Sequence, residues 1–242
     1  ALASGGRLIY IGSGTTGRLC FLDPAECPPT FGVSPSRVVS VLAGGPRAMA
    51  RAVEGAEDSA SGGRDALRAL DLARDDLVCG ISASGTTPFV RGALRYAARR
   101  RVPSALVTCG PAPAVEGAAD ILVRLDVGPE VVSGSTRMKA GLATKAVLHT
   151  VSTAAMIRLG KVYDNLMVDV LPTNKKLRLR AEGIVRTLTG LSQREAAHYL
   201  RKAKDRPKVA VVMALHDVSE RRARALLDEH GGHLRPLIEQ AP

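Results

Sequence analysis

Aromatic side chains are scarce in this chain of 242 residues: they make up 3% of it, and tryptophan is absent. Proteins that bind single-stranded nucleic acids stack bases on such side chains, so the composition speaks against that function despite a formal net charge of +11. The arginines and lysines are spread along the chain, and we interpret them as a general property of the composition. The alternative is a basic surface that attracts an anionic small substrate. We expect no nucleic-acid partner.

Long apolar runs are also missing, and none could span a bilayer. The first residues lack the charged and apolar regions of a signal peptide. The chain does not begin with methionine, and it enters a strand-like segment almost at once. We therefore expect a cytoplasmic protein without a membrane partner, from which an amino-terminal segment is missing.

The cysteines and histidines are few and lack useful spacing. No pair of cysteines has the spacing of metal ligands, and we interpret all of them as small buried side chains in a reducing compartment. The histidines have no carboxylate or thiolate partners at ligand spacing. We expect neither a metal ion nor a cofactor. The four cysteines are Cys20, Cys27, Cys79 and Cys109.

A glycine-rich stretch near the start is the most informative part of the chain. Residues 7–18 read as a buried strand, a loop of small residues and the beginning of a helix. Glycines allow a sharp turn and close approach to a ligand, and a helix N-terminus attracts phosphate. The hydroxyls of Thr15 and Thr16 add donors. Together with Ser13 and Gly14, they form a candidate phosphate-binding loop.

The same glycine spacing fits a dinucleotide-binding fingerprint, which needs an acidic residue after the second strand to hold the ribose. We place that strand at residues 38–43, and no acid follows it. Arg47 keeps a phosphorylated dinucleotide open as an alternative.

A second loop of the same kind follows the apolar residues 77–81 and precedes a helical pattern over residues 89–99. In an open parallel sheet, such loops lie together at the carboxyl ends of the strands, where ligands bind. We therefore expect both loops to converge on one phosphate. The binding residues predicted in this loop are Ser82, Ser84, Gly85 and Thr87.

Strands and helices alternate through the rest of this region, with further strands at 105–108 and 121–125. This spacing predicts an α/β fold with a doubly wound, mostly parallel five-stranded sheet. From Ser135 or Thr136, which we expect to cap it, a long central helix runs to about residue 159. Three short helices then form a small carboxyl-terminal subdomain, with domains at 1–185 and 186–242.

Several carboxylates are candidate acid–base groups, although most glutamates are solvated surface residues. Glu26 comes just before two prolines, which we expect to end a short helix over residues 19–25. Glu57 lies in an acidic run around a glycine. Glu130 precedes the long helix, and Lys139 near the start of that helix opposes its dipole unless it meets an anion.

Five ordered segments resemble the N-acetylmuramic acid 6-phosphate etherases, and the likeness covers essentially the whole chain. The family is also similar to glucokinase regulatory protein, which binds sugar phosphates without catalysis. The resemblance implies a sugar isomerase (SIS) fold with a UBA-like helical tail. The segments are GSGTTGR at 12–18, ECPPTFG at 26–32, AVEGAEDS at 52–59, GSTRMKAG at 134–141 and NLMVDV at 165–170.

The resemblance implies cleavage of the D-lactyl ether of N-acetylmuramic acid 6-phosphate by elimination and hydration, without a metal, in cell-wall recycling. By position in the motifs, Glu57 resembles the base and Glu26 the acid, and Ser135 and Lys139 join the substrate-binding residues. The family pattern usually has arginine where Thr86 stands. A homodimer is implied. A non-catalytic sugar-phosphate sensor and a sugar-phosphate isomerase remain alternatives.

Overall fold

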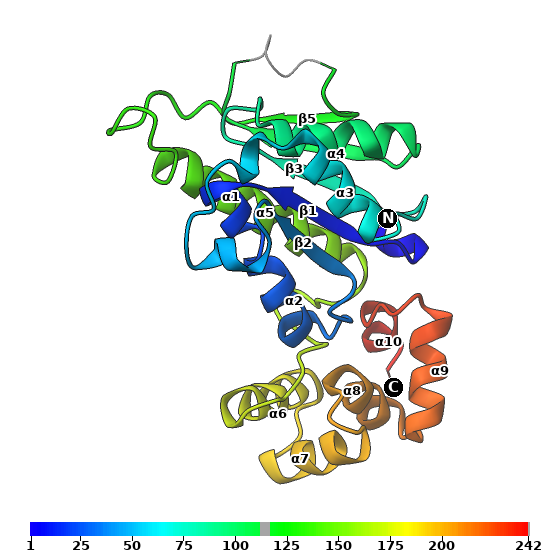
Figure 1. Ribbon diagram of the computed structural model, residues 1–242. Helices are drawn as coiled ribbons and strands as arrows, with labels where there is room; N and C mark the ends of the chain where they lie inside the picture. Colours follow the sequence, from blue (N-terminus) through cyan, green and yellow to red (C-terminus); the bar gives the residue numbers. More distant parts are fainter. Residues whose placement is uncertain (112–116, 242) are drawn as a thin grey trace. The chain divides into compact units, whose positions relative to one another are not determined.

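A parallel β-sheet forms the centre of the computed structural model, which describes residues 1–111 and 117–241 (Figure 1). Its strand order is β2-β1-β3-β4-β5, and every neighbouring pair is parallel. The α/β fold and the five-stranded sheet predicted from the sequence are confirmed. The strands are β1 (Leu8–Gly12), β2 (Val38–Leu42), β3 (Leu77–Ile81), β4 (Ser104–Thr108) and β5 (Ile121–Arg124).

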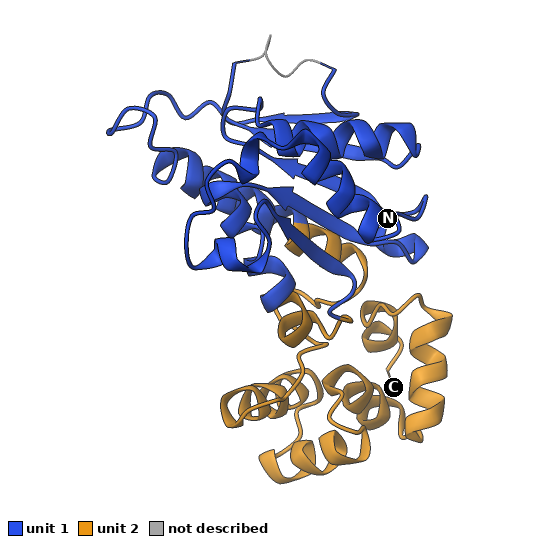
Figure 2. Cartoon of the chain, viewed as in Figure 1, with its two compact units in different colours: residues 1–25, 35–151 blue, residues 26–34, 152–242 orange. Residues whose placement is uncertain are grey.

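The chain divides into two compact units (Figure 2), one of residues 1–25 and 35–151 and the other of residues 26–34 and 152–242. The first contains the sheet, and the second is helical. The domain boundary expected after residue 185 falls within α6 (Lys175–Thr189), all of which belongs to the second unit. The reason is that Ala181, Ile184 and Val185 of α6 are buried in the helical core.

Helices cover both faces of the sheet because side chains alternate along a strand. Ile9 and Ile11 of β1 belong to the core that β1 shares with α3 (Ala60–Ala69) and α4 (Pro88–Arg99). Tyr10 points the other way, and its hydroxyl lies 3.4 Å from the carbonyl oxygen of Leu148 in α5 (Lys139–Arg158). One face of the sheet therefore packs against α3 and α4, and the opposite face packs against α5 (Figure 1).

Glycines allow α3 and α4 to pack at very short range. A Cβ atom on Gly92 of α4 would lie 2.0 Å from the carbonyl oxygen of Ala60. A Cβ atom on Gly63 of α3 would lie 1.9 Å from the carbonyl oxygen of Phe89. Any larger residue at either position would force these two helices apart.

Two helix predictions near the site need correction. Pro28 and Pro29 do not end a helix: they lie inside α2 (Leu22–Phe31), which follows α1 (Gly14–Leu19). The fixed φ of proline suits a helix, and the bond from the Gly32 N–H to the Pro28 carbonyl keeps the last turn closed. The long helix α5 begins at Lys139 rather than after Ser135, and Leu142 on it is 67% exposed, so α5 is not buried all round.

The helical unit is larger than three short helices. Within the described residues, α6 packs with α7 and α8, and α9 and α10 follow. Lys208 at the start of α8 is buried, and its Nζ donates to the carbonyl oxygens of Gly160 and Gly232 and to Asp169 Oδ2. Burial lowers the pKa of Lys208, although Asp169 opposes this shift. The last helices are α7 (Gln193–Lys202), α8 (Pro207–His216), α9 (Glu220–Glu229) and α10 (Arg235–Glu239).

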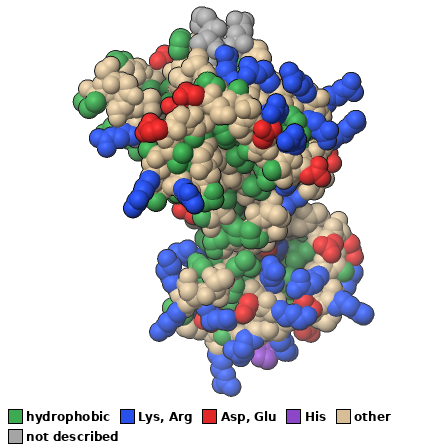
Figure 3. Space-filling model, in the orientation of Figure 1, with side chains coloured by type: hydrophobic (Ala, Val, Ile, Leu, Met, Phe, Trp, Pro, Cys, Tyr) green, Lys and Arg blue, Asp and Glu red, His purple; other side chains and the backbone are tan. Residues whose placement is uncertain are grey.

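Lys and Arg side chains are scattered over several parts of the face that is visible in Figure 3. Among the described residues, no helix is both long enough and apolar enough to cross a bilayer.

Candidate functional site

The two hydroxyl-bearing loops leave the sheet side by side. Strands β1 and β3 are parallel neighbours, and Gly12 at the end of β1 is paired with Ile81 at the end of β3. From β1 the chain moves to β2 in one direction across the sheet, and from β3 it moves to β4 in the opposite direction. Such a reversal of direction opens a crevice at the carboxyl ends of the strands, where ligands bind. The sequence-based expectation that both loops share one edge is confirmed.

The first loop is pinned by close packing and by a buried hydroxyl. A Cβ atom on Gly17 would lie 2.6 Å from the Gly12 carbonyl carbon, so α1 can pack this tightly only with glycine there. The Thr16 hydroxyl donates to the Ser13 carbonyl at 3.0 Å and lies 3.4 Å from the Ile81 carbonyl. Thr16 thus links the first loop to the end of β3, and its contact with a ligand stays a prediction, as does that of Gly14 and Thr15.

The second loop is organised around Ser82. Its hydroxyl lies 2.7 Å from the Thr87 hydroxyl and accepts a hydrogen bond from the Gly85 N–H at 3.0 Å. The Ser84 hydroxyl accepts bonds from the N–H and the hydroxyl of Thr86. Thr87 is the N-cap of α4, and its side chain makes no capping bond there. The loop therefore presents hydroxyls at a helix N-terminus, an arrangement that suits phosphate.

Glu57 is held against the first loop. Its Oε2 accepts a hydrogen bond of 3.2 Å from the Ser13 hydroxyl, and Glu57 lies in the short helix η3 (Ala56–Asp58). Both residues line a cavity of about 200 Å³. Its other lining residues include Gly14, Arg18 and Glu54. The structure thus brings a carboxylate, a hydroxyl and a cation together at the edge where the strands end.

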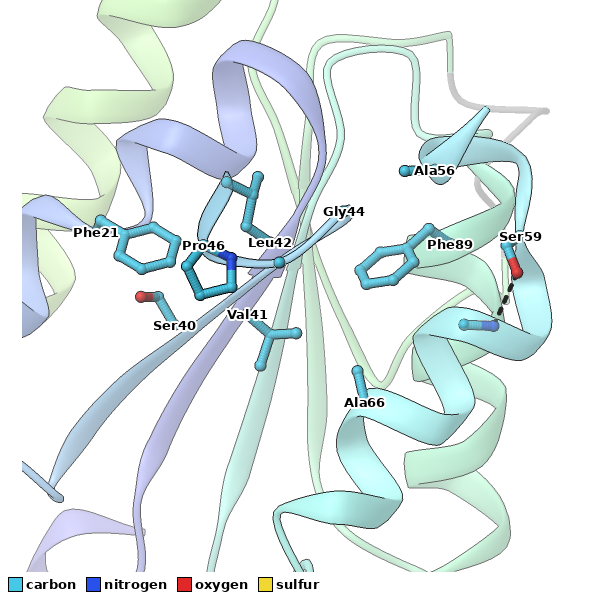
Figure 4. A pocket seen from close by; sticks show the side chains of 12 residues that line it. Phe21, Ser40, Val41, Leu42, Gly44, Pro46, Ala56, Ser59, Ala66 and Phe89 are labelled. Atoms are coloured by element: carbon cyan, nitrogen blue, oxygen red, sulfur yellow. Dashed lines mark hydrogen bonds between the residues drawn. The ribbon is translucent and has the colours of Figure 1, made fainter. Parts of the chain in front are cut away.

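A larger cavity of about 550 Å³ lies near this one and shares Ala56 with it (Figure 4). Phe21, Val41 and Phe89 are among its walls, and no described residue that lines it has an ionisable side chain. Ser59, at its rim, accepts a hydrogen bond from the Gly62 N–H and caps α3. Because acid–base catalysis needs ionisable side chains, the smaller cavity is the better candidate for the site.

The start of α5 lies beside the first loop. A Cβ atom on Gly141 would lie 3.7 Å from Thr15 Cγ2. Ser135 does not cap α5: Glu130 does, because its carboxylate accepts bonds from the N–H groups of Lys139 and Ala140, both at 3.1 Å. The anion beside the backbone of Lys139 is therefore the Glu130 carboxylate. The Lys139 side chain donates through Nζ to the Pro129 carbonyl. Binding of substrate by Ser135 and Lys139 stays a prediction.

Glu26 is exposed on α2, three residues after a buried aspartate. Asp23 Oδ2 accepts a hydrogen bond of 2.9 Å from the Tyr10 hydroxyl, and Asp23 Oδ1 lies 2.7 Å from His149 Nδ1. These contacts fix the first turn of α2, and Glu26 follows directly after that turn. Glu26 belongs to the helical unit and Glu57 to the sheet unit. Their catalytic roles stay predictions.

The cysteines behave as buried thiols. Cys20, Cys27 and Cys79 are buried, and none of the four described cysteines forms a disulfide. Burial raises the pKa of Cys79 to about 12 and that of Cys20 well above its ordinary value. Within the described ranges, no group of three or more His, Cys, Asp or Glu side chains could hold a metal ion.

Comparisons with known proteins identify the family. Residues 2–98 match the family model of the glucokinase regulatory protein N-terminal SIS domain. An N-acetylmuramic acid 6-phosphate etherase from Yersinia pestis (strain Pestoides F) is 51% identical over 98% of this chain and 81% of the relative. The chain belongs to the N-acetylmuramic acid 6-phosphate etherase family. The etherase of Yersinia pseudotuberculosis serotype O:1b (strain IP 31758) matches with the same identity and coverage.

Among solved structures, the C-terminal domain of glucosamine-fructose-6-phosphate aminotransferase from Francisella tularensis is 15% identical, with a TM-score of 0.43 over 90% of this chain and 58% of that one. The SIS match of this etherase-family chain, residues 2–98, contains both loops and both glutamates.

Sequence reasoning missed two features of this etherase-family site. It gave Arg18 no role, although a cation at the end of a glycine-rich loop is a usable signal for an anionic ligand. It also did not single out Asp23 or pair it with His149. Their spacing in the sequence gives no sign of this pair, because β1, α2 and α5 come together only in the fold.

Proposed function

We propose that this chain is an N-acetylmuramic acid 6-phosphate etherase, a lyase that releases D-lactate and forms N-acetylglucosamine 6-phosphate. The observation that carries the proposal is the Ser13–Glu57 hydrogen bond at the edge where β1 and β3 end. It sets a carboxylate against the first hydroxyl-bearing loop, and the second such loop follows the neighbouring strand β3. The 51% identity to relatives of that name supports it.

The phosphate of the sugar binds at the 82–87 loop in this proposal. The Ser82, Ser84 and Thr87 hydroxyls and the N-terminus of α4 provide donors and a favourable dipole. Ser13, Thr15 and the backbone of Gly14 complete the grip from the neighbouring loop. Holding the phosphate fixes the sugar ring, so that C2 lies against Glu57.

Elimination and hydration then follow as acid–base steps. The Glu57 carboxylate takes the C2 proton, the electron pair forms a C2–C3 double bond, and the C3–O bond to lactate breaks. Glu26 gives a proton to the leaving oxygen. Water adds its oxygen at C3, and C2 regains a proton, which yields N-acetylglucosamine 6-phosphate. Each positioned acid or base supplies roughly a hundred- to ten-thousand-fold in rate. None of these steps calls on a metal ion or a cofactor.

The proposal includes a homodimer that acts in the cytoplasm, in the recycling of cell-wall sugars. Apolar side chains between residues 131 and 142 are exposed in the sheet unit, and such patches favour contact with another chain. Val131 is 87% exposed, Val132 63% and Leu142 67%. Light scattering after gel filtration tests this part: a monomer at micromolar concentration would refute it.

The decisive experiment is direct. Purified protein is incubated with N-acetylmuramic acid 6-phosphate, and D-lactate and N-acetylglucosamine 6-phosphate are measured. We expect both in equal amounts. A bound but intact substrate would indicate a sugar-phosphate sensor, and an isomerised sugar with its lactyl group retained would indicate an isomerase. Either result would overturn the proposal.

A further inference from the structure

Arg18 is held rigidly at the wall of the cavity that contains Glu57. It lies in the last turn of α1, and its Nε donates to the carbonyl oxygens of Ala48 at 2.8 Å and Met49 at 3.3 Å. These bonds fix the plane of the guanidinium. In the part of the chain that the structure describes, Nη1 and Nη2 form no hydrogen bond or ion pair. Two donors of a planar fork are therefore left for a ligand.

The charged side chains that line the cavity restrict which ligand groups can bind there. Glu54 and Glu57 line it together with Arg18, and neither forms an ion pair with Arg18 within the described residues. A third carboxylate entering this space is repelled by two negative charges. It is stabilised there only if a cation meets it directly.

The etherase substrate carries two anions at opposite ends. Its phosphate is on C6, and its lactyl carboxylate hangs from the ether oxygen on C3. The phosphate is assigned first to the hydroxyls of the 82–87 loop, which does not line the cavity of Arg18; of the described groups that complete its binding, Ser13 and Gly14 line that cavity and Thr15 does not. The carbon that Glu57 deprotonates is C2, the neighbour of C3. The lactyl group must therefore enter the cavity that holds both Glu57 and Arg18.

We propose that Arg18 binds the lactyl carboxylate through Nη1 and Nη2. This inference rests on the proposed etherase function and names the group that gives the site its specificity. A planar guanidinium matches a carboxylate with two parallel hydrogen bonds, which a lysine cannot reproduce. Arg18 thereby distinguishes a sugar phosphate that bears a lactyl group from one that lacks it.

The test compares two ligands in the same variants. Arg18→Met removes the charge, Arg18→Lys keeps the charge without the fork, and Arg51→Met is the control. Arg51 is exposed and does not line the cavity. The readouts are KM for lactate release from N-acetylmuramic acid 6-phosphate and the inhibition constant of N-acetylglucosamine 6-phosphate, which has the phosphate but no lactyl group.

We expect Arg18→Met to raise KM by roughly 10- to 100-fold, as expected when a charged hydrogen-bonded pair is lost. Arg18→Lys should be intermediate and Arg51→Met unchanged. The inhibition constant of N-acetylglucosamine 6-phosphate should stay within about twofold of its wild-type value, which also shows that the variant is folded. An equal loss for both ligands, or no change in KM, would overturn the assignment.

The wild-type protein provides a test that no folding defect can obscure. The methyl ester of the lactyl carboxylate removes the anion from the substrate and leaves the phosphate in place. We expect its KM to rise by the same factor as in Arg18→Met, and an unchanged KM would refute the inference. Failure of wild-type protein to release lactate from the unmodified substrate would instead refute the proposed function.

Discussion

The Ser13 hydroxyl donates a hydrogen bond of 3.2 Å to Glu57 Oε2, across 44 residues of sequence. The bond joins the loop after β1 to η3, a short helix in the segment between β2 and α3. A carboxylate on such a connection would otherwise sample many rotamers. Here its position is tied to the sheet, because Ser13 directly follows β1. The predictions on catalysis start from this contact.

Glu57→Gln should abolish catalysis while the fold survives. The amide keeps an oxygen that can accept the Ser13 hydrogen bond, but it cannot take a proton. We expect lactate release and exchange of the C2 proton with deuterated water to fall by about 10²- to 10⁴-fold. Proton NMR measures the exchange. Glu54→Gln, which changes another carboxylate of the same cavity, is the control. Wild-type exchange in Glu57→Gln would refute the base role.

Glu26→Gln should separate the two halves of the reaction. With the base intact, the C2 proton still exchanges with solvent, while the lactate oxygen leaves without a proton donor. We expect lactate release to fall by about 10²- to 10⁴-fold and exchange to persist. The same NMR experiment and a D-lactate assay measure both rates. If exchange and release fell together, Glu26 could not be assigned as the acid alone.

Gly92→Ala should destabilise the sheet unit. The added Cβ would lie 2.0 Å from the Ala60 carbonyl oxygen, so α3 and α4 would have to separate. We expect a loss of about 1–3 kcal/mol or more in the free energy of unfolding, as for overpacked cores. Gly183→Ala in α6 is the matched control, because its Cβ would meet nothing within 4 Å. It should gain about 0.5–1 kcal/mol, and urea unfolding measures both.

Lys208→Met should destabilise the helical unit. It removes the Lys208 donor from the carbonyls of Gly160 and Gly232, and among the described residues Asp169 keeps Lys161, at 3.2 Å, as its one ion-pair partner. Breaking a buried pair in this way costs about 3–5 kcal/mol. Chemical denaturation with a helix-sensitive signal measures the loss. Lys175→Met, an exposed change at the start of α6, should have little effect. Equal stabilities of the two variants would contradict the expectation.

Asp76 should make the protein sensitive to acid. Burial acts to raise the pKa of this carboxyl, but hydrogen bonds from Arg7 and from the backbone of Ala73 and Arg7 outweigh it, and the folded pKa lies below its ordinary value. In the unfolded chain an aspartate has a pKa of about 3.9. The unfolded state then binds more protons, so this stabilisation is present above about pH 4 and is lost as the pH falls through the folded pKa.

Urea titrations between about pH 5 and pH 2 measure this dependence. We expect Asp76→Asn to be less stable than wild type at neutral pH and to show a flatter decline in acid. Identical slopes for the two proteins would exclude Asp76 as a source of the acid sensitivity.

The sheet and its two hydroxyl-bearing loops could be predicted because their signals are local. Short apolar runs followed by Gly, Ser and Thr predict β1 and β3 with their loops, and alternating elements predict a parallel order. Contacts between distant segments could not be predicted. The start of α5 depends on Glu130, nine residues before Lys139. Helix α2 continues through Pro28 and Pro29 because the flanking turns remain bonded.

The same limit applies to the candidate site. Ser13 and Glu57 were each predicted as site residues, but their direct contact depends on the path of the chain between β2 and α3. Arg18 gains its orientation from carbonyls 30 and 31 residues further along. Residue type therefore identified most candidate groups, and only the fold shows which of them meet.

Glu130 has a consequence for how a ligand can lie at this edge of the sheet. Its carboxylate already occupies the exposed N–H groups that begin α5, so that end of the helix is neutralised from within the chain. In the proposed reaction, an incoming phosphoryl group is repelled there and meets the hydroxyls of the 82–87 loop, which follows β3. We therefore expect one of two opposite orientations of the sugar to be favoured before any catalytic group acts.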